Sequence, residues 1–149
     1  MPIRRLPERA QHDRADLYAV LDAMWVATLS VAVGEVAQSV PILYGRDGDS
    51  IVLHGSTGAG TLRLLAAGRP ATVCVSTIDG FVYAESLFDS SANYRSAVVT
   101  GPVEVLSGAA ADAALLALSE RIMPGRAAEV RPSTPVSYTH LTLPTNREV

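Results

Sequence analysis

Residues 50–68 of the chain read SIVLHGSTGAGTLRLLAAG, and most of what the sequence predicts starts from this stretch. The apolar run at 50–54 predicts a strand, and the Leu-rich run at 61–67 predicts a helix that ends at Gly68. The turn between them is rich in glycine, so that backbone N–H groups can converge there without side chains in the way. The stretch therefore predicts a cradle for a cofactor phosphate between a strand and a helix.

The side chains near this turn suit the same chemistry. Ser56, Thr57 and Thr61 supply hydroxyl donors, and Arg63 supplies a planar guanidinium that matches phosphate oxygens. Two known phosphate motifs do not fit, because a P-loop needs Lys where Thr61 stands and the dinucleotide fingerprint needs glycine at Arg63. The alternative is a flexible connection that only caps a helix.

On both sides of this stretch, short helical patterns alternate with strand patterns. Helices are predicted at 13–25 and 109–122, and further strands at 26–33, 36–44, 71–78, 81–88 and 94–106. Tight turns are expected at Gly34-Glu35 and Asp79-Gly80, and these imply antiparallel pairing because parallel neighbours need long crossovers. We therefore expect a mainly β protein, a small barrel whose openings are covered by short helices.

Composition limits the classes of function. The chain has 149 residues, which suits one domain, and its net charge of −3 gives no reason to expect nucleic-acid binding. It lacks both an apolar run of the roughly 20 residues that span a bilayer and an N-terminal secretion signal, so we expect no membrane partner and a cytoplasmic protein. Cys74 is the single cysteine, and no cluster of ligands has the spacing of a metal site, so we expect no metal.

The residue composition of the sequence changes abruptly near residue 135. Residues 136–145 resemble one reading frame of the transposon-end adaptor that is used to prepare sequencing libraries. The alternation of Thr and Leu at 139–143 also suits a short strand. We expect residues 1–135 to form the domain, incomplete at its C-terminus, and residues 136–149 to be a non-native tail.

A wider set of motifs resembles one protein family. The motifs are the Val-Pro step at 40–41 and the segments Asp47–Ser56, Leu65–Gly68, Asn93–Gly101 and Pro124–Arg126. In this order they resemble the pyridoxamine 5′-phosphate oxidase-like proteins, and within them the flavin-nucleotide-binding or nitroimidazole-resistance-like subgroup. The resemblance spans roughly residues 4–132. It implies an antiparallel FMN-binding split barrel of the Greek-key type, here truncated at its C-terminus, and a homodimer with FMN at the subunit interface.

The resemblance also implies a set of cofactor contacts. Ser56, Thr57, Thr61 and Arg63 would hold the ribityl phosphate, His54 and Gly55 would lie near the flavin or a substrate pocket, and Arg95 and Ser96 would contact the cofactor from a neighbouring strand or the other subunit. His54 is the candidate catalytic residue, because an imidazole beside a flavin can donate a proton. The alternative for His54 is a strand-end side chain that is bonded to the backbone.

Two hypotheses for function follow from this resemblance. The first is an FMN-dependent oxidoreductase that acts on an unknown small molecule, with the redox chemistry carried by the flavin. The second is a non-catalytic module that binds a flavin, a deazaflavin or haem. The C-terminal signature of true pyridoxamine phosphate oxidases, which contains Arg and His, is not visible, so vitamin B6 oxidation is not expected.

Overall fold

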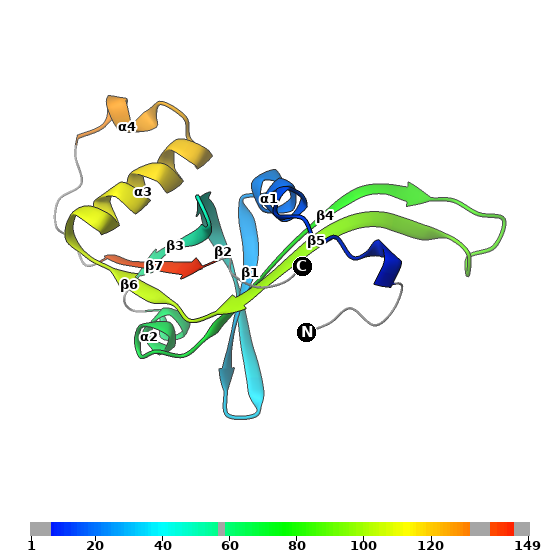
Figure 1. Ribbon diagram of the computed structural model, residues 1–149, viewed down its shortest axis with the longest axis horizontal. Helices are drawn as coiled ribbons and strands as arrows, with labels where there is room; N and C mark the ends of the chain where they lie inside the picture. The colour runs from blue at the N-terminus through cyan, green and yellow to red at the C-terminus, as the bar shows by residue number, and fades with distance from the viewer. Residues whose placement is uncertain (1–6, 57–58, 132–137, 145–149) are drawn as a thin grey trace.

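The computed structural model describes residues 7–56, 59–131 and 138–144 (Figure 1). A short 3-10 helix, Pro7–Arg9, comes first. In chain order the other elements are α1 (Arg14–Ala23), β1 (Val26–Val33), β2 (Val36–Asp47), β3 (Ser50–Ser56), α2 (Gly60–Ala66), β4 (Ala71–Val82), β5 (Ser91–Gly101), β6 (Glu104–Leu106), α3 (Gly108–Ile122), α4 (Arg126–Glu129) and β7 (Tyr138–Pro144).

The strands form one antiparallel sheet in the order β5-β4-β1-β2-β3-β7-β6. Within it, β4 returns beside β1 after the β1-β2-β3 meander, and this is the Greek-key arrangement. The two outer strands, β5 and β6, are consecutive along the chain, so the sheet turns back toward itself (Figure 1). In the described residues no strand pairing joins these two edges, and the barrel is open. The expected mainly β fold with short helices is confirmed.

Local sequence explains why the first elements form where they do. Asp13 caps α1 by accepting a hydrogen bond from the Ala15 N–H at 3.0 Å. In β1 alternate residues face the core, as the pattern of buried Ala27 and Leu29 shows. Gly34 adopts a φ of 61° in the β1-β2 hairpin, a conformation that glycine accepts without strain.

The prediction for residues 79–88 is wrong. Asp79-Gly80 is not a hairpin turn, because β4 runs through it to Val82, and the register shifts between Ile78 and Gly80. The glycine marks a bulge in a continuous strand. The run 81–88, which was predicted as a strand, supplies only the end of β4, and its apolar side chains at 83, 87 and 88 are exposed.

The predicted long strand at 94–106 is broken into two. β5 ends at Gly101 and β6 begins at Glu104, and they lie on opposite edges of the sheet. Pro102 has no N–H to give to a ladder, so the strand stops there and the chain changes direction.

The main hydrophobic core lies between α1, α2 and one face of the sheet, and includes Leu21, Leu29, Leu53 and Leu65. Helix α3 rests instead on a smaller, separate cluster, formed by Val52, Ala114 and Leu118. In Figure 1, α3 lies beside the β3-β7-β6 part of the sheet, while the β4-β5 arm extends away from it. The position of α3 matters below because this helix forms one wall of a cavity.

Residues 138–144 form β7, which lies between β3 and β6, with Leu143 buried in the main core. The strand that the Thr and Leu alternation allows is therefore present. A strand forms here whatever the origin of these residues, so the non-native tail at 136–149 stays a prediction.

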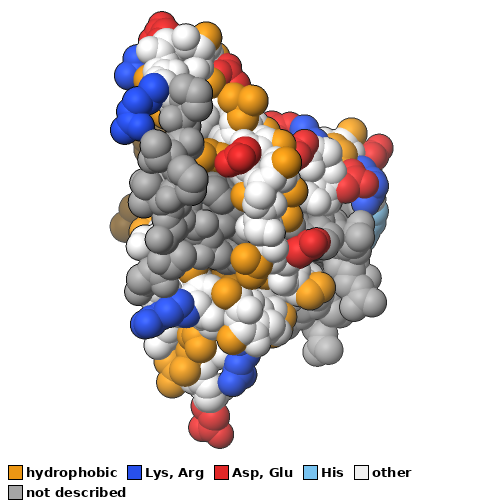
Figure 2. Space-filling model, turned by 90° about the vertical axis from the view of Figure 1, so that its left-hand side faces the viewer, with side chains coloured by type: hydrophobic (Ala, Val, Ile, Leu, Met, Phe, Trp, Pro, Cys, Tyr) orange, Lys and Arg blue, Asp and Glu red, His pale blue; other side chains and the backbone are white. Residues whose placement is uncertain are grey.

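In the parts of the chain that the structure describes, no helix is long and apolar enough to cross a membrane. On the face seen in Figure 2, the described Arg side chains and the acidic side chains are dispersed, without one continuous basic surface.

Candidate cofactor site

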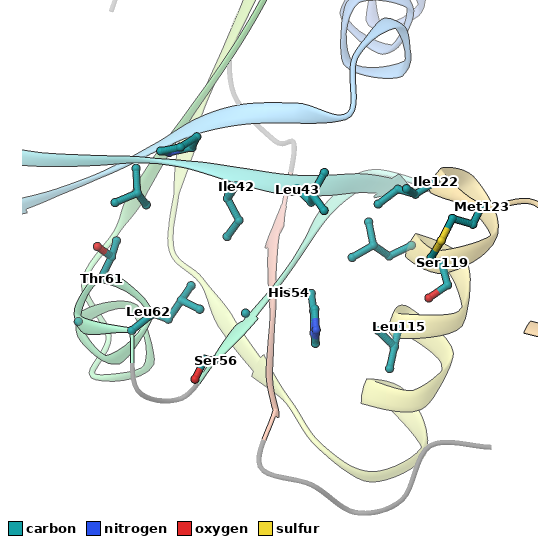
Figure 3. Close-up of a pocket in the computed structure, with 16 residues that line it drawn as sticks. Ile42, Leu43, His54, Ser56, Thr61, Leu62, Leu115, Ser119, Ile122 and Met123 are labelled. Carbon is teal, nitrogen blue, oxygen red and sulfur yellow. The ribbon is translucent and has the colours of Figure 1, made fainter. Parts of the chain in front are cut away.

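A cavity of about 680 Å³ lies between the glycine-rich turn, strand β2 and helix α3 (Figure 3). This volume is within the range of small-molecule and cofactor pockets. Its lining is mainly apolar, with a few polar groups, and consists of residues 40–43, 54–56, 59–62, 115, 118, 119, 122 and 123. The predicted strand-turn-helix stretch thus borders a cavity of the right size for a cofactor ring.

One end of the cavity is formed by the start of α2. Ala59 is the N-cap of α2 and makes no side-chain cap bond, and the first helical bond runs from the Arg63 N–H to the Ala59 carbonyl. The N–H groups of residues 60–62 precede that bond, so helix geometry leaves them without partners inside the helix. Ser56 and the buried Thr61 add hydroxyl groups at this end. This donor set suits an anion such as a phosphate.

His54 projects from the middle of the cavity wall. Residues of β3 alternate between two faces, so that Leu53 contributes to the main core while Val52 packs on the α3 side. His54 shares the face of Val52, and its side chain points into the space between β3 and Leu115 of α3 (Figure 3). Its Nδ1 atom is buried. The structure therefore places the candidate catalytic imidazole inside the cavity.

Gly55 has a role that the sequence did not predict. A Cβ atom added to Gly55 would overlap Cδ1 of Leu62, a buried residue of α2. The glycine therefore allows β3 and α2 to pack closely, in addition to lining the cavity. At Gly60, by contrast, an added Cβ would meet nothing within 4 Å.

Several predicted residues lie away from this cavity. Arg63 is exposed on α2 and does not line the cavity, and Thr57 lies outside the described residues. Arg95 and Ser96 lie on β5, in the arm that extends away from α2 and α3 (Figure 1). Within one chain the structure brings together His54, Gly55, Ser56 and Thr61, but does not bring β5 to them.

Arg95 of β5 binds Asp79 of β4, within the same arm. Its guanidinium donates two hydrogen bonds to Asp79, at 2.9 and 2.8 Å, and it holds the pKa of the Asp79 carboxyl below its usual range. Ser96 is exposed and lies opposite Ser76 of β4. A cofactor in the cavity described above would be contacted by these two residues only from a second subunit.

The residues that sequence reasoning missed are on α3 and at its C-cap. Leu115, Leu118, Ser119, Ile122 and Met123 form the wall opposite His54. Their spacing of three and four residues is a helical stripe, and it lies beside the stripe of Ala111, Ala114 and Leu118 that packs on the sheet. Two adjoining stripes on one helix are a signal that the helix has two neighbours, and here the second neighbour is the cavity.

Polar contacts attach α3 to α1. Arg121 of α3 donates hydrogen bonds from Nη2 to the carbonyls of Leu21, Asp22 and Met24, at 3.2, 2.9 and 3.1 Å. These carbonyls lie at the C-terminal end of α1, where a cation is favourable. The hydroxyl of buried Tyr44 in β2 also donates to Leu21, and burial raises the pKa of Tyr44 to about 12.

In the described part of the chain, no group of three or more His, Cys, Asp or Glu side chains could hold a metal ion. The donors that are present fit a cofactor that carries a phosphate, because hydroxyl and N–H groups lie at one end of the cavity and an imidazole lies in its middle, while the other end is apolar. No charged side chain is among the described residues that line the cavity.

Known proteins share this fold and sequence pattern. The sequence model of the family described as Pyridoxamine 5'-phosphate oxidase matches residues 13–146. The structure is similar to that of the FAD and haem binding protein from Mycobacterium smegmatis, with a TM-score of 0.88 and 40% sequence identity over 93% of this chain and 69% of that chain. No curated protein matches the sequence.

Two further solved structures are similar. The flavocytochrome Anf3 from Azotobacter vinelandii has a TM-score of 0.86 at 26% identity, over 96% of this chain and 68% of that chain. A Bacteroides thetaiotaomicron protein assigned to 5-nitroimidazole antibiotic resistance shares the fold, with a TM-score of 0.73 at 17% identity over 93% of this chain and 82% of that chain. With a family match over most of its length and a relative at 40% identity, this chain belongs to the pyridoxamine 5′-phosphate oxidase-like family.

Proposed function

We propose that this protein binds FMN in the cavity at the glycine-rich turn and acts as a cytoplasmic oxidoreductase on a small molecule. The observation that carries the proposal is the cavity itself, with hydroxyl and N–H donors at the α2 end, His54 in its wall and apolar residues at the α3 end. A bound flavin would supply two-electron transfer. The protein would bind and orient the flavin and keep water from its ring.

Different residues of the turn would make different contacts with the cofactor. Ser56, Thr57, Thr61 and the N–H groups at the start of α2 would hold the phosphate, and Arg63 would add a positive charge from the exposed side of α2. His54 would lie beside the ring or the substrate, where an imidazole can donate a proton. Gly55 would keep α2 against β3.

We also propose that the site is completed in a homodimer. Arg95 and Ser96 lie on the β4-β5 arm, away from the cavity of their own chain (Figure 1). Cofactor contact by these residues therefore requires the arm of a second subunit to reach the cavity. In that case FMN would lie at the interface between the two subunits.

Cofactor identification on the purified protein tests the proposal. We expect a yellow protein with flavin absorbance near one equivalent per chain, and mass spectrometry of the released cofactor then separates FMN from FAD. A colourless protein whose melting temperature does not rise with excess FMN would contradict the proposal, because a ligand that binds the native state stabilises it.

A second measurement separates an enzyme from a binding module. An oxidoreductase loaded with flavin is expected to be reduced anaerobically by NADH or NADPH and reoxidised by its substrate. A protein that binds flavin tightly and is not reduced by either nucleotide would favour the non-catalytic alternative.

The position of His54 favours one further candidate, a haem-binding module. A neutral imidazole in an apolar cavity is a common ligand of haem iron, and the similar M. smegmatis protein is described as binding FAD and haem. Titration with haemin tests this candidate, with the Soret band as the readout. His54→Ala should abolish a shifted Soret band and His12→Ala, at an exposed position, should not. Binding of a deazaflavin cofactor is tested by a similar titration, in which the absorbance of the deazaflavin itself is followed.

A further inference from the structure

The α3 half of the cavity is without charge in the described part of its lining. Four residues of α3 and its C-cap face it, namely Leu115, Leu118, Ser119, Ile122 and Met123. With Ile42 and Leu43 of β2 they form a wall whose single side-chain hydroxyl belongs to Ser119. The hydroxyl donors and helix N–H groups of the site lie at the other end, at the start of α2.

The charged residues of α3 nearest to this wall are bonded elsewhere. Glu120 accepts hydrogen bonds from the N–H groups of Gly125 and Ala127, at 2.7 and 3.3 Å. Arg121 is held by the carbonyls at the end of α1 and forms an ion pair with Asp22 at 3.5 Å. Neither side chain lines the cavity. The segment 119–123 therefore presents Ser119, Ile122 and Met123 to the cavity, while its two charged side chains are bonded outside it.

An ionised group that entered this half would lose its water and meet no Arg, Lys, Asp or Glu side chain of the described lining, in which His54, on the facing wall, is the one ionisable residue. That loss is unfavourable, whereas an uncharged apolar group gains from burial against leucine, isoleucine and methionine side chains. The Ser119 hydroxyl offers one hydrogen bond, which suits a single carbonyl or similar oxygen on such a group.

We infer that the α3 half of the cavity selects a substrate that is uncharged and largely apolar, and rejects carboxylated or phosphorylated compounds. The inference rests on the proposed function, because it assigns the phosphate of the cofactor to the α2 end and the substrate to the α3 end. It makes Leu115 and Ser119 specificity-determining residues.

A matched pair of probes tests the inference. 2-Naphthamide and 2-naphthoate have the same ring system and nearly the same shape, and at pH 7.5 only the second carries a charge. Isothermal titration calorimetry on the purified full chain, with whatever cofactor it carries, is expected to give at least tenfold tighter binding of the amide. Equal affinities, tighter binding of the carboxylate, or no binding of either probe would overturn the inference.

Neighbouring leucines of α3 provide the matched variants. Leu115 lines the cavity, while Leu116 is 51% exposed and does not. Leu115→Arg is expected to reverse the preference, so that 2-naphthoate binds more tightly, and Leu116→Arg is expected to keep the wild-type preference. Ser119→Arg is the second cavity variant, in case circular dichroism shows that Leu115→Arg does not fold. Identical behaviour of the cavity variants and Leu116→Arg would also overturn the inference.

The result is distinguishable from failure of the proposed function. A protein that carries flavin but does not discriminate between the probes loses only the inference about substrate class. A protein that discriminates between them as expected, and binds neither FMN nor FAD, loses the proposed flavin function while the selectivity of the cavity stands.

Discussion

At the scale of single residues, the alternation along β3 gives neighbouring residues different tasks. His54 faces the cavity on the α3 side, and Gly55 faces α2, where a Cβ would overlap Leu62. The end of β3 therefore needs a polar side chain at His54 and, at Gly55, a residue without a Cβ. The packing of α2, and with it the position of the helix start that borders the cavity, depends on Gly55.

Substitution of the two described glycines of the turn tests this dependence. Gly55→Ala is expected to reduce the free energy of unfolding by about 1–3 kcal/mol, because Leu62 must move in a packed core. Gly60→Ala is the control: an added Cβ meets nothing within 4 Å, so its effect should be near zero or slightly stabilising. Equal losses of stability in urea denaturation of the two variants would contradict the packing role.

Tyr44 gives a prediction for alkaline pH. Burial raises its pKa to about 12, above the ordinary value of 10.0, so the folded state resists ionisation of the phenol. Below pH 10 both states are protonated and the stabilising effect is complete; as the pH rises toward 12 the unfolded state ionises first and stability falls. Tyr44→Phe should remove this part of the pH dependence. An unchanged decline between pH 10 and 12 in the variant would contradict the assignment.

At the scale of elements, α3 is attached to the rest of the molecule by a small apolar cluster and by Arg121. It rests on a small cluster separate from the main core, and Gly45 of β2 allows it to approach, with Leu118 Cδ1 3.0 Å from the place of a Cβ. Arg121 then connects its C-terminal turn to α1. We expect α3 to open more readily than the central sheet, because it has fewer buried apolar contacts.

Two arginines that bind the same end of α1 allow a controlled test. Arg121→Gln should speed amide hydrogen exchange in residues 108–122, because it loses bonds to the carbonyls of α1. Arg46→Gln is the control, since Arg46 belongs to β2 and donates its hydrogen bonds to Asp22 and to the Gly48 carbonyl. If α3 exchanges at the same rate in both variants, Arg121 does not hold this wall of the cavity.

An element can be predicted from the sequence when the residues that determine it lie close together in the chain. The stretch 50–68 was predicted as strand, turn and helix because its signals lie within a few residues of one another. The apolar residues of the run 81–88 resemble a core pattern and so predict a strand, and only the fold shows that they are exposed. The wall formed by α3 depends on which elements lie opposite His54, and this is a property of the tertiary structure.

At the scale of the whole molecule, a large sheet face and an extended arm lack a covering layer within the described chain. Ile78 and Tyr94 lie opposite each other on β4 and β5 and are 62% and 66% exposed. Large exposed apolar side chains that cluster in this way are typical of a protein interface. The homodimer that we propose would bury them and bring a second arm to the cavity.

Sedimentation equilibrium tests the proposed dimer. The wild type should have twice the chain mass of 15.7 kDa, and Tyr94→Asp should shift it toward the monomer by placing a charge in the interface. Val130→Asp, an exposed apolar position beyond α4, is the control and should remain dimeric. A monomeric wild type, or a dimeric Tyr94→Asp protein, would argue against this interface.

The central claim is that the turn beside this cavity binds the phosphate of FMN, and an FMN titration of three proteins tests it most directly. The wild type should bind one FMN per chain, and Arg63→Ala should bind it about 10- to 100-fold more weakly, the usual effect of losing a charge-assisted hydrogen bond. Arg69→Ala, which removes an exposed arginine beyond α2, should bind FMN like the wild type. No binding of FMN by the wild type, or full affinity in Arg63→Ala, would contradict the account.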